Sequence, residues 1–110
     1  FPKKATLERM RWAGLCPADF ALVTTYEDYH FAKPSAGYFQ EVLQNLGKSP
    51  SDCLMVGNDM VEDMGASQIG TDIFFLTDHL INKSGAEIAS YRHGGFDDLL
   101  RLIDALPDVE

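Results

Sequence analysis

The chain has 110 residues, of which 45% are hydrophobic and 24% charged, and its net charge at pH 7 is −8. This length is enough for one small domain with a modest core. Nucleic acids and anionic membranes attract clustered lysine and arginine, and the nine basic residues here are scattered through an acidic chain, so neither is expected as a partner.

Helices and apolar segments alternate along the first half of the sequence. Residues 3–13 carry spaced apolar side chains and predict an amphipathic helix. The apolar, β-branched segment 20–25 predicts a strand, and a polar loop then leads to Lys33 and Pro34. Ser35 is placed to cap a helix over residues 36–46, whose apolar side chains share one face.

The second half continues the alternation. Residues 53–56 and 72–76 predict two more strands, and residues 60–69 predict a short helix between them. A long polar segment covers residues 77–95, and the apolar spacing over 96–106 predicts a last helix. Near-continuous apolar strands alternating with helices predict an α/β fold, in which helices cover both faces of a parallel, doubly wound (Rossmann-like) sheet to give three layers.

The clearest chemical signal follows the strand expected at residues 53–56. There the apolar run breaks at Gly57 into Asn58 and Asp59, and Asp63 follows four residues after Asp59. Two carboxylates at this spacing lie on one side of a helix start and repel each other unless a cation such as Mg²⁺ neutralises them. Carboxylates at a helix start also serve as caps and dipole partners, so the spacing leaves a metal site and a helix cap both open.

A second candidate is Lys33. Pro34 restricts the backbone of the preceding lysine to an extended geometry, which directs its side chain, and a directed ammonium suits a phosphate group. A lysine in a polar loop is also ordinary solvated surface. His30, His79 and His93 are too dispersed to predict a metal site.

Together these features resemble the third and fourth motifs of the haloacid dehalogenase-like (HAD) hydrolases, most of which are phosphatases. The resemblance rests on Lys33 and Pro34, on the helix over 36–46 and on the acidic loop at 56–64, and it identifies residues 1–110 as the C-terminal part of the family's core domain. It implies a small phosphorylated substrate, Mg²⁺ as cofactor and an aspartyl-phosphate intermediate. Lys33 would orient and charge-stabilise the nucleophile and the phosphoryl group, while the acidic loop would hold the metal.

The acidic loop departs from the family at one position. The family's usual loop has an aspartate directly after the glycine, and here Asn58 follows Gly57. The first metal ligand is therefore either Asn58, through its amide oxygen, or Asp59. Asp63 is the second acid in both cases.

The resemblance also implies that part of the active site lies outside this sequence. No Asp-x-Asp follows a strand in the 110 residues, and the family's second motif has no counterpart. We therefore expect a fragment or processed product, whose nucleophile and first two strands precede Phe1, and which is inactive alone. The sheet would be incomplete, with the segment 20–25 apart from the other strands, so the chain would self-associate or retain its missing half.

A noncatalytic alternative remains open. The chain can also be read as a doubly wound binding or scaffold module whose acidic loop only caps a helix. Its two cysteines, Cys16 and Cys53, form neither a disulfide framework nor zinc-ligand spacing, and no apolar run reaches the length of a membrane span. Both interpretations therefore predict a cytoplasmic protein.

Overall fold

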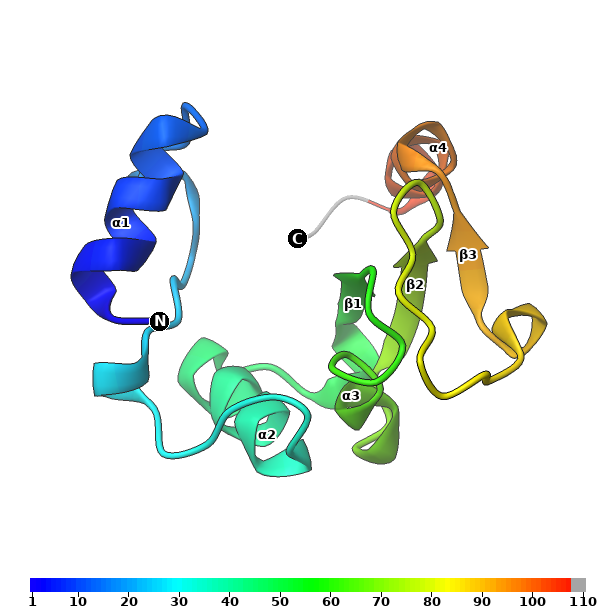
Figure 1. Ribbon diagram of the computed structural model, residues 1–110, viewed down its shortest axis with the longest axis horizontal. Coiled ribbons are helices and arrows are strands. Elements are labelled where there is room, and N and C mark those ends of the chain that lie inside the picture. Colours follow the sequence, from blue (N-terminus) through cyan, green and yellow to red (C-terminus); the bar gives the residue numbers. More distant parts are fainter. Residues whose placement is uncertain (108–110) are drawn as a thin grey trace.

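The computed structural model describes residues 1–107 and contains a sheet of three parallel strands (Figure 1). The strands are β1 (Leu54–Gly57), β2 (Asp72–Leu76) and β3 (Arg92–Gly94), in the spatial order β1-β2-β3. Val56 lies opposite Phe74 in the first pair, and Phe75 lies opposite His93 in the second. The parallel pairing confirms the α/β fold expected from the sequence.

Four α-helices accompany the sheet in residues 1–107. They are α1 (Lys3–Trp12), α2 (Ala36–Leu46), α3 (Gly65–Gln68) and α4 (Phe96–Ala105). Helix α2 has the predicted ends: Ser35 Oγ accepts a hydrogen bond from the Gly37 amide at 3.1 Å, and Gly47 ends the helix with a φ of 66°. Figure 1 shows α1 and the sheet at opposite ends of the molecule, with α2 between them.

The core lies between β2 and helices α2 and α3. Ile73 and Phe75 of β2 are almost fully buried against Phe39 of α2 and Ala66 of α3. Because side chains alternate along a strand, Phe74 points to the other face of the sheet, where α4 packs on β2 and β3. Helices thus cover both faces, as the predicted three-layer arrangement requires. None of the helices in residues 1–107 has the length and apolar character needed to cross a bilayer.

The strand predicted at residues 20–25 is wrong. Phe20 and Thr25 do have extended backbones, with φ/ψ of −115°/142° and −140°/154°. An extended segment becomes a strand only when a neighbouring strand completes its hydrogen bonds, and no strand pairs with this segment within the described part of the chain. The segment lies apart from the sheet, beside α1 (Figure 1).

The helix predicted at residues 60–69 is shorter than expected. Only Gly65–Gln68 is helical, because the loop before it bonds to a distant segment: Met60 N donates to Ile81 O at 2.9 Å, and Ile81 N donates to Asn58 O at 2.7 Å. The segment 77–95, described from the sequence only as polar, contains β3. Its Arg-His-Gly sequence has no strand pattern, so only pairing with β2 reveals this strand.

Candidate functional site

The structure brings Lys33 and Asp63 together at the carboxyl end of β1. Lys33 Nζ donates a hydrogen bond to Asp63 Oδ1 at 2.6 Å, although the two residues are 30 apart in sequence. The Asp63 side chain is only 3% exposed and that of Lys33 is 33% exposed. Lys33 is therefore not an ordinary solvated lysine, because a buried carboxylate holds one side of its ammonium and the other side remains accessible.

Gly57 makes room for the Asp63 carboxylate. A Cβ atom placed on Gly57 would lie 1.9 Å from Asp63 Oδ2, far inside van der Waals contact. The same oxygen accepts a hydrogen bond from the Asp59 amide at 3.2 Å. The glycine at the end of β1 thus lets the acidic loop fold back so that Asp63 lies directly against the strand.

Gly65 plays a similar part on the lysine side. A Cβ atom there would lie 2.3 Å from the Pro34 carbonyl oxygen and 2.9 Å from Cε2 of Phe39. The start of α3 therefore packs directly on the Lys33-Pro34 loop and on α2. The close backbone approaches at Gly57 and Gly65 therefore fix the position of Lys33 relative to the Asp63 carboxylate.

Asp59 caps the turn that follows it and not a helix, because α3 begins only at Gly65 and its N-cap residue, Met64, makes no side-chain cap hydrogen bond. Its Oδ1 accepts hydrogen bonds from the amides of Val61 at 2.9 Å and Glu62 at 3.1 Å. The Glu62 amide in particular, with the Val61 amide and more distant lysine charges, holds the pKa of Asp59 below its usual value. The Asp59 carboxylate is thus kept ionised, as both a metal ligand and a cap for backbone amides require.

Asn58 faces a different neighbour. Its Nδ2 donates to the carbonyl oxygen of His79 at 3.2 Å, which ties the acidic loop to the segment after β2. Among residues 1–107, no group of three or more histidine, cysteine, aspartate or glutamate side chains is arranged to hold a metal ion. The three candidate ligands thus share one loop but bond to different partners. Asp63 bonds to Lys33, Asn58 bonds to the His79 carbonyl oxygen, and Asp59 bonds to amides of its own loop.

The histidines take no part in the Lys33–Asp63 pair. His30 Nδ1 contacts Glu41 Oε2 at 2.6 Å on the surface, and His93 Nδ1 lies 2.9 Å from the Tyr91 carbonyl oxygen. Each of these two histidines is thus held by a partner in its own neighbourhood.

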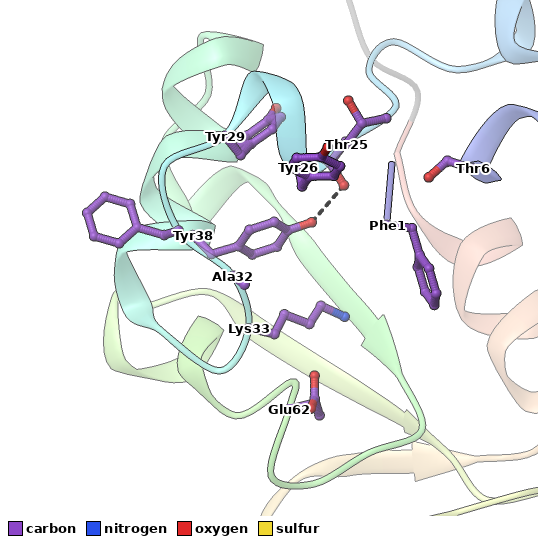
Figure 2. Close-up of a pocket in the computed structure, with 11 residues that line it drawn as sticks. Phe1, Thr6, Thr25, Tyr26, Tyr29, Ala32, Lys33, Tyr38 and Glu62 are labelled. Atoms are coloured by element: carbon purple, nitrogen blue, oxygen red, sulfur yellow. Dashed lines mark hydrogen bonds between the residues drawn. The ribbon is translucent and has the colours of Figure 1, made fainter. Parts of the chain in front are cut away.

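A cavity of about 410 Å³ adjoins Lys33 (Figure 2). Tyr26, Tyr29 and Tyr38 line it together with Lys33 and Glu62. Tyr38 belongs to α2, and the two other tyrosines lie in the loop before Lys33, where aromatic residues in a polar segment are the sequence signal for this wall. Lys33 thus borders a space lined by both aromatic rings and threonine side chains.

Comparison with solved structures identifies the fold. The chain superposes on the crystal structure of a HAD phosphatase from Thermococcus onnurineus with a TM-score of 0.70 and 24% identity, covering 93% of this chain and 46% of that one. An uncharacterized protein from Listeria monocytogenes serotype 4b matches with a TM-score of 0.69 and 15% identity, covering 94% of this chain and 65% of that one. The chain thus spans less than two thirds of the length of each protein.

Sequence comparison adds no relative. No family model matches the chain, and no curated protein matches it. The parallel sheet, the lysine loop, the acidic loop and the two structural similarities agree with each other. This chain therefore has a haloacid dehalogenase-like fold.

Proposed function

We propose that this chain supplies the lysine and the acidic loop of a magnesium-dependent HAD-type phosphohydrolase. The nucleophilic aspartate, which would form an aspartyl-phosphate, would come from sequence encoded before Phe1. The observation that carries the proposal is the 2.6 Å pair between Lys33 Nζ and the buried Asp63, beside an open cavity. Below, the extended protein means this chain together with that upstream sequence.

In this proposal Lys33 stabilises negative charge on the transferred phosphoryl group. Asp63 and the packing of Gly65 against Pro34 fix the ammonium before substrate arrives, so little reorganisation is needed. Preorganised charge of this kind is a large contribution to many enzyme rates. The accessible side of the ammonium is where phosphate oxygens would bind.

The acidic loop fits Mg²⁺ in part. Magnesium binds one or two protein carboxylates and completes its shell with water and phosphate oxygens, and Asp59 and Asp63 are neighbouring carboxylates, with the Asp59 amide bonded to Asp63. Asp63 would be one ligand, and either Asp59 or Asn58 the other. When bound, the ion would neutralise charge on the phosphoryl group.

The first prediction concerns catalysis by the 110-residue chain alone. We expect no hydrolysis of a generic aryl phosphate, because the sequence has no Asp-x-Asp nucleophile and the lysine cannot form the covalent intermediate. The extended protein should hydrolyse the same ester under the same conditions. Turnover by the purified 110-residue chain, retained through repeated chromatography and by independent preparations, would contradict the proposal.

The second prediction concerns metal affinity. In the extended protein, Asp63→Asn should weaken Mg²⁺ binding, measured by calorimetric titration, because it removes one of few carboxylate ligands. Asp59→Asn and Asn58→Ala form the matched pair that distinguishes the two candidates for the other ligand: the variant of the true ligand should also bind Mg²⁺ more weakly. Wild-type affinity in Asp63→Asn would favour the noncatalytic alternative.

That alternative, a noncatalytic binding module, has one observation in its favour. Asp59 already accepts two backbone hydrogen bonds, and Asp63 already binds Lys33 and the Asp59 amide. Both carboxylates are thus satisfied without a metal. A scaffold domain would keep these contacts for stability alone, and its Asp63→Asn variant would lose stability without losing any Mg²⁺ affinity.

A further inference from the structure

Residues 79–82, called the strap below, run alongside the acidic loop. Met60 N donates to Ile81 O at 2.9 Å, and Ile81 N donates to Asn58 O at 2.7 Å. Asp59 and Ile81 thus form a parallel β-bridge. The strap therefore extends, beyond the end of β1, the parallel pairing that β1 makes with β2.

The side chain of Asn58 adds a third hydrogen bond between the loop and the strap. Its Nδ2 donates to the His79 carbonyl oxygen at 3.2 Å. A carbonyl oxygen only accepts hydrogen bonds, so the group that faces it must be a donor. The amide of asparagine supplies that donor, whereas an ionised carboxylate would place two acceptors against each other. This contact gives a physical reason for an asparagine directly after Gly57.

The strap is itself held in place. Leu80 packs against the core cluster that contains Met60, which is only 1% exposed. Asn82 Nδ2 donates to the Ala86 carbonyl oxygen at 2.9 Å, which closes a turn at the end of the strap. Because the core holds the strap, a hydrogen bond from Asn58 to the strap restrains the acidic loop.

Asp59 lies between the points at which the loop bonds to the strap. Asn58 on one side of it and Met60 on the other both make these bonds, so the backbone of Asp59 is held from both sides. Its Oδ1 accepts the amides of Val61 and Glu62, whereas its Oδ2 accepts no hydrogen bond from the described residues. The loop thus presents a carboxylate oxygen whose backbone is fixed and which is available to a cation.

The contact with the strap does not depend on upstream sequence. A strand pairs along two edges, and β2 already occupies one edge of β1. The strands expected from upstream sequence would join the opposite edge, whereas the strap belongs to the segment that follows β2. The extended protein should therefore keep the bonds between the loop and the strap.

We propose that Asn58 is a positioning residue rather than a metal ligand. Its side-chain amide fixes the acidic loop to the strap and so sets the position of Asp59, which then supplies the second carboxylate beside Asp63. The inference rests on the proposed function for the purpose of the loop, but the bond from Asn58 to the strap requires no metal.

Hydrogen exchange in this chain without metal tests the contact, because the Ile81 amide is bonded to Asn58 O. In Asn58→Asp, the Ile81 amide should exchange roughly threefold to tenfold faster than in wild type, the effect of losing about one hydrogen bond that opposes local opening. Amides of the β1–β2 ladder should keep their wild-type exchange rates, which shows that the variant is folded and that the loss is local.

Asn82→Asp is the matched control. It makes the same chemical change in a side chain that also donates to a backbone carbonyl oxygen, but that bond lies within the turn after the strap. Exchange of the Ile81 amide in this variant should stay at the wild-type rate.

Magnesium titration of the extended protein separates the two roles considered for Asn58. Protein carboxylates are the preferred side-chain ligands of Mg²⁺, so a ligand role predicts tighter binding by Asn58→Asp than by Asn82→Asp, which adds the same charge. A positioning role predicts no such gain.

Three results would overturn the inference: wild-type exchange of the Ile81 amide in Asn58→Asp, equal acceleration by Asn82→Asp, or tighter Mg²⁺ binding by Asn58→Asp than by Asn82→Asp. Faster Ile81 exchange in Asn58→Asp, combined with an extended protein that binds no Mg²⁺, contradicts the proposed function and leaves the contact with the strap established.

Discussion

The Lys33→Met variant of the extended protein should lose phosphatase turnover by roughly a hundredfold to a thousandfold, the cost typical of removing one preorganised charge-stabilising donor. Methionine keeps much of the aliphatic stem and removes the ammonium, which lies 2.6 Å from Asp63 Oδ1 and opens onto the cavity. The measurement is kcat for an aryl phosphate at saturating Mg²⁺. Turnover within a few-fold of wild type would refute the role of Lys33.

Lys33→Arg is the matched control for charge. It preserves the positive charge but replaces a compact ammonium with a planar fork, so turnover should recover only in part. A variant that acts only by loss of stability would instead recover fully when folding is restored. Comparing kcat at a temperature where each variant is fully folded separates these two causes.

The same substitution should also reduce stability. Lys33→Met leaves Asp63 buried without its cation, since the Asp63 side chain is only 3% exposed. We expect a loss of roughly 1–3 kcal/mol in the free energy of unfolding, less than for a fully buried pair because Lys33 is partly solvated. In urea denaturation, adding Asp63→Asn to Lys33→Met should recover part of that loss, because it removes the unpaired charge.

Gly57→Ala should destabilise the chain by about 1–3 kcal/mol and weaken the Lys33–Asp63 pair. Gly57 does not have a positive φ, so alanine can adopt its backbone conformation, and the expected cost comes from the added atom. That Cβ would lie 1.9 Å from Asp63 Oδ2 and would displace the carboxylate from its place against β1. Urea denaturation of this chain measures the loss directly.

A double-mutant cycle identifies the cause of that loss. Asp63→Ala removes the carboxylate that the new Cβ would meet, so Gly57→Ala should cost much less in the Asp63→Ala background. Gly95→Ala is the control for a general glycine effect, because the nearest atom to its Cβ, Asp78 Oδ1, is 3.3 Å away. Additive effects of the changes at Gly57 and Asp63 would show that the overlap is not the source.

Local sequence determined several elements of this fold. Helix α2 has its predicted cap at Ser35 and its end at Gly47, since both depend on hydrogen bonds and backbone angles within a few residues. Strands β1 and β2 also follow from short apolar runs, with β1 shifted by one residue at each end. The alternation of these elements was enough to predict the parallel α/β class.

Tertiary structure alone decided the rest, because those features depend on partners far along the chain. Phe20 and Thr25 have extended backbones, yet residues 20–25 form no strand, whereas β3 forms from a sequence without a strand pattern. The reason is that a strand needs a neighbouring strand to complete its hydrogen bonds. The spacing of Asp59 and Asp63 could not show that one carboxylate caps its own loop while the other binds Lys33, 30 residues away. These different partners depend on the burial of Asp63 and on its close approach to Gly57, and residue spacing alone contains neither.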